Sequence, residues 1–142
     1  MIRRAICLGM ATLIASAVTV VTHAEKSEVP DDALSVKIGQ TVYVAFLADG
    51  DKLVSPHVLP KATTTEPMVT IQLTQDGPTR TLLVTNGFAK TLVYRAFGRA
   101  RGRRREIEIQ VVPVRGGLQS IVTLAEPYEA MLLFGFHLTD SE

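Results

Sequence analysis

The sequence predicts an all-β protein, built as a single antiparallel β-sandwich of about seven or eight strands. Three observations predict this fold class. Apolar residues recur at every second position through most of the chain after residue 33, which is the period of a strand with one buried face. Residues 25–142 contain no convincing apolar stripe at helical spacing, and turn residues separate the alternating runs at short intervals.

Residues 1–24 have the layout of a secretory signal peptide. Two arginines come first, residues 6–21 are mainly apolar, and the stretch ends in Thr22-His23-Ala24, with a small residue on each side of a spacer. This order is typical of a segment that inserts at the translocon and is then removed. The alternative is a retained membrane anchor, since the apolar stretch approaches the length of a bilayer span. We expect cleavage, no stable membrane span afterwards, and an exported protein, either periplasmic or secreted.

Cleavage after Ala24 changes the chemistry of the chain. It removes Cys7, the one cysteine of the sequence, so that stability has to come from apolar burial and not from disulfides. It also removes Arg3 and Arg4, which leaves 13 of the 15 basic residues against 14 acidic ones, a net charge of −1. This balance argues against a general nucleic-acid-binding protein.

The predicted domain begins after a polar leader at residues 25–33, which we expect to be flexible, and spans residues 34–142. Its alternating runs are residues 41–47, 68–74, 79–85, 91–97, 105–111, 118–124 and 131–138. Because successive side chains of a strand point to opposite faces, the alternation groups the following residues on shared faces: Val42, Val44 and Phe46; Val69, Ile71 and Leu73; Leu82 and Val84; Leu92, Tyr94 and Ala96; Ile107, Ile109 and Val111.

Two connections bear on the topology. Residues 48–67 carry three prolines and are long for a loop inside a domain, so they form either a binding loop or a short edge strand. Asn86-Gly87 is a strong turn pair, because both residues tolerate the positive φ of tight connections. This pair forms either a plain hairpin or the start of a wider loop that crosses from one sheet to the other.

The segment around this turn, with VTN before it and LVY after it, resembles immunoglobulin-like domains of exported bacterial proteins. In those domains an Asn-containing loop separates two core strands. The resemblance implies an immunoglobulin-like sandwich and implies no activity, since fold alone does not specify function.

The densest positive charge of the chain lies in five arginines within seven residues: Arg99, Arg101, Arg103, Arg104 and Arg105. Guanidinium groups match the geometry of phosphates and carboxylates. This loop is therefore the candidate contact for an anionic envelope component or for a partner protein. The alternative is a solvated hairpin tip that Glu106 and Glu108 partly neutralise. Nucleic acid is not expected, because only Tyr94 and Phe97 lie near enough to stack on bases.

The last strand, residues 131–138, is apolar on both faces apart from His137. The alternation places Leu132, Phe134, Phe136 and Leu138 on one face and Met131, Leu133 and Gly135 on the other. Such a run is expected of an internal strand with both faces covered. It is also compatible with an edge strand that docks a second subunit or pairs with a partner by strand addition.

Catalytic and metal sites have no clear signature in this sequence. His57 and His137 would contribute to a metal site only if the fold brought them together with Asp49, Asp51 or Met68. The chain has no G-x-S-x-G or H-E-x-x-H pattern and no phosphate-binding glycine loop. We therefore predict no catalytic residue, no cofactor and no metal, and expect a non-enzymatic binding or assembly module. A small metal-handling protein and a hydrolase of unrecognised type are the alternatives.

Overall fold

Nine β-strands make up the regular structure of the protein in a computed structural model that describes residues 29–63, 66–102 and 105–140. The predicted signal peptide and the first residues of the predicted leader lie outside the described residues. The strands are β1 (Leu34–Lys37), β2 (Thr41–Asp49), β3 (Lys52–Leu59), β4 (Val69–Asp76), β5 (Thr79–Asn86), β6 (Thr91–Ala100), β7 (Glu106–Ile109), β8 (Gln119–Leu124) and β9 (Tyr128–Thr139). The described residues contain no helix.

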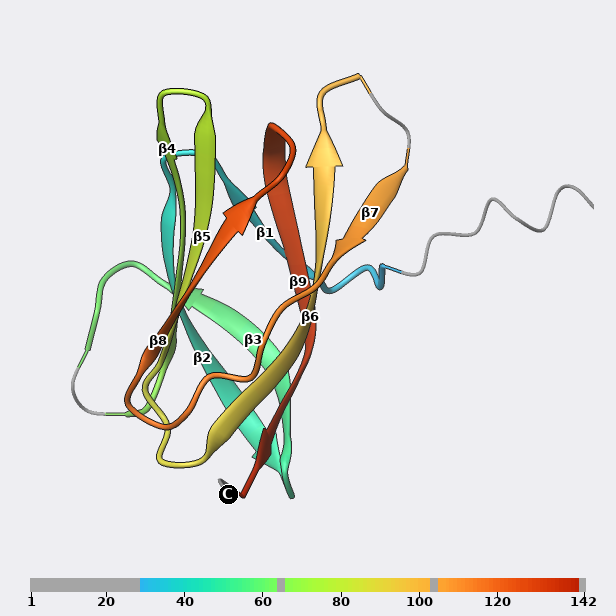
Figure 1. Ribbon diagram of the computed structural model, residues 1–142. Coiled ribbons are helices and arrows are strands. Elements are labelled where there is room, and N and C mark those ends of the chain that lie inside the picture. Colours follow the sequence, from blue (N-terminus) through green and yellow to red (C-terminus); the bar gives the residue numbers. More distant parts are fainter. Residues whose placement is uncertain (1–28, 64–65, 103–104, 141–142) are drawn as a thin grey trace, which may run out of the picture.

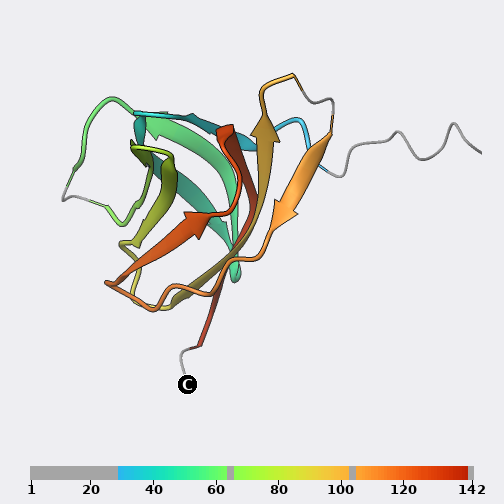
Figure 2. The same ribbon diagram turned by 45° about the horizontal axis from the view of Figure 1, so that its top comes forward.

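All strand pairs are antiparallel, in the order β7-β6-β9-β3-β2-β4-β5-β8, and β1 pairs with β9. The sheet is strongly curled, so that β4 and β5 lie across from β6 and β9 (Figure 1), and the turned view shows the same half-barrel shape (Figure 2). The all-β antiparallel class is thus confirmed. The two separate sheets of a sandwich are not confirmed, because one hydrogen-bonded path joins the strands.

The strand count exceeds the predicted seven or eight because residues 34–37 form the short strand β1 and residues 48–67 contain a full strand. β2 continues to Asp49, a turn at Gly50 with φ of 64° reverses the chain, and β3 then pairs with β2 from Lys52 to Leu59. The segment therefore contains a strand, but not the short edge strand of the second alternative, because β3 has eight residues and lies between β9 and β2 in the sheet. Pro56 is accommodated at an irregularity of the ladder, which is where a strand tolerates proline.

The core lies inside the curl and confirms most of the predicted faces. Strand periodicity buries alternate apolar side chains of β2, β4, β5 and β6. The members of the core cluster from these strands are Val42, Val44, Val69, Ile71, Leu73, Leu82, Val84, Leu92, Tyr94 and Ala96, with Phe46 partly buried against them. Ile109 and Val111 also pack against the core, whereas Ile107 lies on the short edge strand β7 and is 37% exposed.

Tyr94 packs inside the curl against the neighbouring strand β9. Its ring stacks on Phe136 of β9 with 5.9 Å between ring centroids. Burial raises the pKa of the Tyr94 phenol, and the Ser120 hydroxyl of β8 offsets part of that rise. Neither hydroxyl reaches hydrogen-bond geometry with a partner in the described part of the chain. Apolar packing is therefore the main contribution of this contact to stability.

The chain crosses from one half of the curl to the other between β5 and β6. β5 pairs with β4 and β8, whereas β6 pairs with β9 and β7, so these consecutive strands do not form a hairpin. The wider-loop alternative for Asn86-Gly87 is the one observed. Gly87 is required there, because a Cβ atom would lie 2.4 Å from the carbonyl oxygen of Met68.

Asn86 holds this crossing in place with a complete set of hydrogen bonds, although its side chain is fully buried. Its Nδ2 donates to the carbonyl oxygens of Lys90 and Val114, each at 2.8 Å. Its Oδ1 accepts from the Phe88 N–H at 2.8 Å. Its backbone N–H donates to Leu118 and its carbonyl accepts from Gly117, each at 2.9 Å. One residue therefore ties the crossing loop to the segment that leads into β8.

We predict that Asn86→Asp lowers the free energy of unfolding by about 3 kcal/mol or more, because the carboxylate cannot donate to the two carbonyls and is itself buried. Urea denaturation followed by circular dichroism measures the change. The matched control is Gln119→Glu, which alters an exposed amide in the same way and should change stability by less than about 1 kcal/mol. Equal losses in the two variants would contradict the assigned role of Asn86.

Candidate binding site between β3 and β9

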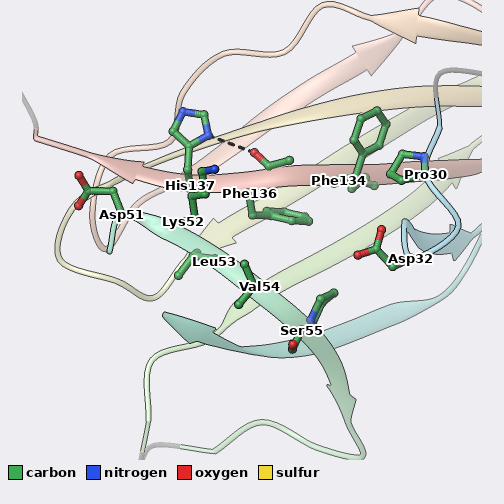
Figure 3. Close-up of a pocket in the computed structure, with 13 residues that line it drawn as sticks. Pro30, Asp32, Asp51, Lys52, Leu53, Val54, Ser55, Phe134, Phe136 and His137 are labelled. Carbon is green, nitrogen blue, oxygen red and sulfur yellow. Dashed lines mark hydrogen bonds between the residues drawn. The ribbon is translucent and has the colours of Figure 1, made fainter. Parts of the chain in front are cut away.

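Strands β3 and β9 are joined at one end and then separate. Lys52 pairs with His137, and the Leu138 N–H donates to the carbonyl oxygen of Asp51 at 2.7 Å. Beyond this joint, β3 has no further strand partner on that side within the described ranges. β1 pairs with β9 only as far as Leu133. Between Leu133 and His137, β9 therefore has no recorded strand pairing on the side of the opening (Figure 3). Within this stretch, Phe134 is in register with Arg95 of β6, and the Gly135 carbonyl oxygen lies 3.1 Å from His137 Nδ1.

A bulge in β9 is one cause of this separation. The register with β6 shifts between Val93 and Arg95, so that Tyr94 lies opposite two residues, and Gly135 takes a φ of 70°. A glycine in this left-handed region is typical of a bulge that bends a strand.

The bulge also corrects the predicted faces of the last strand. Met131, Leu133 and Phe136 belong to the core cluster, and Leu138 packs against it. Phe134 and His137 lie on the opposite side of β9 from Phe136 (Figure 3). The assignment of Phe134 and Phe136 to one face was wrong, because the inserted residue reverses the alternation after position 135. β9 itself is internal, as predicted, with β6 on one side and β1 and β3 on the other.

A second bulge lies directly across the opening, in β3. The register between β2 and β3 shifts between Ala45 and Leu47, which sets Ser55 and Pro56 opposite Phe46. Ser55 has a φ of 51° and is the non-glycine residue with positive φ in the described part of the chain. Backbone strain of this kind is concentrated at functional sites. The two bulges bend β3 and β9 apart and so create the opening.

The space between the separated strands is a cavity of about 650 Å³, within the range of roughly 300–1,000 Å³ that is typical of ligand sites. Leu53 and Val54 of β3 and Phe136 of β9 form much of its apolar wall (Figure 3). Pro30 and Asp32, from the turn that precedes β1, line its other end. This part of the predicted leader is thus packed beside the cavity.

Aromatic and charged side chains hold Phe134 at the mouth of this cavity. Its ring packs against Phe97 with 5.5 Å between centroids, and the Arg95 guanidinium lies 5.4 Å from each of the two ring centroids. Cation–π contacts of this kind fix the orientation of an aromatic side chain. Phe134 is therefore a positioned part of the rim.

Three charged residues lie together at the closed end of the opening. Lys90 lies 3.4 Å from Asp51 and 3.5 Å from Asp140, measured between Nζ and Oδ1. Asp140 and then Asp51 raise the pKa of the Lys90 ammonium. All three side chains are solvent-exposed, so their pairing contributes little to stability. It nevertheless connects the β5–β6 crossing to the joint between β3 and β9.

The predicted arginine site is partly neutralised by its own hairpin. Arg95 Nε and Nη2 donate to the two carboxylate oxygens of Glu108 at 2.9 and 3.0 Å, and these hydrogen bonds hold the pKa of Glu108 below its usual value. Arg99 Nη2 lies 3.1 Å from Glu106 Oε1. Glu108 and Glu106 therefore partly neutralise Arg95 and Arg99, as expected in the alternative of a solvated hairpin tip.

The remaining arginines are spread over the tip of the β6–β7 hairpin. Arg101 is 93% exposed in its side chain and lies 3.8 Å from Glu129, from Nε to Oε2. Arg105 is also exposed. Arg103 and Arg104 lie outside the described residues. Among the described arginines of this hairpin, Arg101 and Arg105 are the most open to solvent.

The residues considered for a metal site do not come together. His57 lies on β3, five positions from the residue opposite His137, a separation of roughly 17 Å along an extended strand. Each imidazole lies near a local carbonyl oxygen, Ser55 for His57 and Gly135 for His137. Asp51 pairs with Lys90. Residues 29–63, 66–102 and 105–140 contain no group of three or more His, Cys, Asp or Glu side chains arranged to hold a metal ion.

Comparisons of the chain with protein-family models, with curated proteins and with solved structures find no significant match. The described residues also include no helix of the length and apolarity needed to cross a membrane.

The opening between β3 and β9 was not anticipated from the sequence. Pro56 within the connection at residues 48–67 and Gly135 within an apolar run were the available signals, since both residue types mark bulges. Their significance depends on the two bulges facing each other, which the sequence does not reveal.

We predict that Ser55→Gly raises the free energy of unfolding by about 0.5–1 kcal/mol, because glycine adopts positive φ without steric cost. Thermal or urea denaturation measures the difference. The matched control is Ser35→Gly, at an exposed position of the regular strand β1. This variant should lower the free energy of unfolding by about 0.5–1 kcal/mol. A similar loss in both variants would show that Ser55 carries no strain.

Proposed function

We propose that this domain is a non-enzymatic binding module that takes up an extended apolar segment of a partner protein in the opening between β3 and β9. The observation that carries the proposal is the apolar cavity at the place where β3 and β9 separate and where neither strand has a recorded strand pairing on the side of the opening. Strand addition to an exposed edge is an established mode of peptide recognition, in which backbone hydrogen bonds supply affinity and pockets supply specificity.

A peptide fits the opening better than a small apolar molecule does. On the side of the opening, β9 has no recorded strand pairing between Leu133 and His137, and an acyl chain or a similar ligand has no backbone groups with which to add one. An extended peptide supplies N–H and C=O groups at the spacing of a strand. Its alternate side chains would then meet Leu53, Val54 and Phe136 in the cavity.

The length of the opening limits the segment that binds. The unpaired stretch of β9 lies between Leu133, which pairs with β1, and His137, which pairs with β3. This gap of four residue steps corresponds to roughly 13 Å of extended chain. Lys52 lies at one end of the cavity and Asp32 at the other. A complementary segment therefore has about three residues within the gap, with an acidic group near Lys52 and a basic group near Asp32.

We predict that the intact protein binds a synthetic peptide of alternating valine and threonine that carries lysine at one end and glutamate at the other, and that Val54→Asp weakens this binding at least tenfold. The reason is that Val54 lines the cavity, where a carboxylate would be placed against the apolar part of the peptide. Fluorescence polarisation of the labelled peptide, in both charge orders, measures the affinity.

The control is Val58→Asp, which places the same charge on β3 at a residue that is 55% exposed and does not line the cavity. It should leave the affinity unchanged. If neither peptide binds and laurate binds instead with the same dependence on Val54, the cavity accepts small apolar molecules and the peptide proposal fails.

The exposed arginines support a second candidate function, contact with an anionic envelope component or an acidic partner. Arg101 and Arg105 are exposed at the hairpin tip, and Arg103 and Arg104 belong to the same stretch of the sequence. Clustered guanidinium groups attract phosphates and carboxylates in a salt-dependent manner.

We predict that replacing Arg101, Arg103, Arg104 and Arg105 by serine abolishes salt-sensitive retention on vesicles that contain phosphatidylglycerol, because four positive charges are lost. Vesicle co-sedimentation at low and high salt measures the effect. Arg115→Ser is the matched control, since it removes an exposed arginine outside the hairpin. Retention that stays unchanged in the fourfold variant would exclude this contact.

We further propose that the protein acts after export, as a periplasmic or secreted domain with an immunoglobulin-like arrangement. The order of charged, apolar and small residues in residues 1–24 supports export. The narrow joint at Lys52 and His137 supports the immunoglobulin-like arrangement, because the two halves of the curl then behave much like two facing sheets.

A further inference from the structure

Strand β8 has the exposed edge best suited to pair with another strand. It pairs with β5 along its whole length, and its other side has no strand partner in the described part of the chain. Its six residues, Gln119 to Leu124, contain no charge, no proline and no glycine. Its register with β5 shows no bulge. An edge of this kind lacks the features with which proteins usually prevent pairing between molecules.

β7 and β3 are less suited than β8 to pairing with a second copy. β7 has four residues, two of them glutamates in ion pairs with Arg95 and Arg99. β3 is bent by its bulge at Ser55 and Pro56, so it does not offer a regular edge along its whole length to a straight strand of a second copy. This difference singles out β8.

We propose that β8 pairs antiparallel with β8 of a second copy of this chain, around a twofold axis that passes through Ile121. In this register Ile121 lies opposite Ile121 of the second copy, and Gln119 lies opposite Thr123 of the second copy. On the face of Ile121, apolar and polar residues thus meet residues of their own kind, whereas Ser120 lies opposite Val122 on the other face, and no charges are brought together. A twofold contact requires such a self-complementary surface.

The exposed apolar side chains support this register. Ile121 is 66% exposed, the highest value among the large apolar residues of the described chain. It lies beside Leu83, its partner in the β5 ladder. Pairing two copies would place Leu83, Ile121 and their counterparts in one apolar row across the axis, and cross-strand pairs of this type stabilise sheets.

Polar residues flank this apolar row on β5 and β8. Gln119 Nε2 donates to Thr85 Oγ1 at 3.0 Å, and this hydrogen bond orients Gln119 on the same face. A contact through one short strand is smaller than a standard stable interface. The dimer is therefore weak and depends on protein concentration.

The inference is independent of the proposed peptide site. β8 and β3 are separated in the sheet by β5, β4 and β2. A dimer through β8 leaves the opening between β3 and β9 free, so the failure of either proposal does not affect the other.

Sedimentation velocity over a concentration series tests the dimer. We expect concentration-dependent association of the intact protein, and Ile121→Lys should weaken it at least tenfold, since two lysines would then face each other at the axis. Leu47→Lys is the matched control: Leu47 is 60% exposed on β2, and its replacement should leave association unchanged. A protein that stays monomeric at every concentration, or equal losses in both variants, would overturn the proposal.

Disulfide crosslinking tests the register without relying on a disruptive variant. In a Cys7→Ser background, Ile121→Cys should form a dimer on mild oxidation, because residues opposite each other in a ladder lie within disulfide reach. Gln119→Cys and Thr123→Cys should each crosslink poorly alone and efficiently when mixed. Efficient crosslinking of Gln119→Cys alone, or no crosslinking of Ile121→Cys, would contradict this pairing.

Discussion

The buried side-chain amide of Asn86 is the interaction on which the arrangement of the strands depends. β5 and β6 lie in different halves of the curled sheet, and the loop between them carries backbone groups that have no ladder to join. Asn86 pairs with the carbonyls of Lys90 and Val114 and with the N–H of Phe88, so that these groups are satisfied away from water. With this loop fixed, β8 can pair with β5 while β6 pairs with β9.

The opening between β3 and β9 follows from a different constraint, the conflict between curvature and continuous pairing. A strongly curled sheet needs bulges, and here two of them, at Ser55 and Gly135, face each other across one junction. Each bends its own strand, and the single joint at Lys52 and His137 is all that remains of the ladder. The same geometry that lets the sheet enclose a core therefore leaves an apolar gap in its wall.

The sequence predicted the strands well where burial alone decides the pattern. Alternation in residues 68–74 and 79–85 correctly assigned Ile71, Leu73 and Leu82 to the core, since the period of a strand is fixed by its backbone. The prediction failed at Gly135, because one inserted residue reverses every later face. Of the candidate contacts, the arginines could be found from the sequence as a cluster of charge. Val54 and Phe136, in contrast, line the same cavity only because strands distant in sequence lie beside each other.

The chain contains a segment that could close the opening, and its sequence prevents it from doing so. In the register of β1 with β9, Ala33 and Asp32 would lie next to residues 134–136 if β1 began earlier. Instead the Ala33 N–H donates to the carbonyl of Pro30 at 3.2 Å, and this turn carries the chain away from the sheet. Pro30 has no N–H to contribute to a ladder. The vacant edge of β9 is thus built into the sequence before β1, and a strand from a partner protein would occupy the place that β1 leaves.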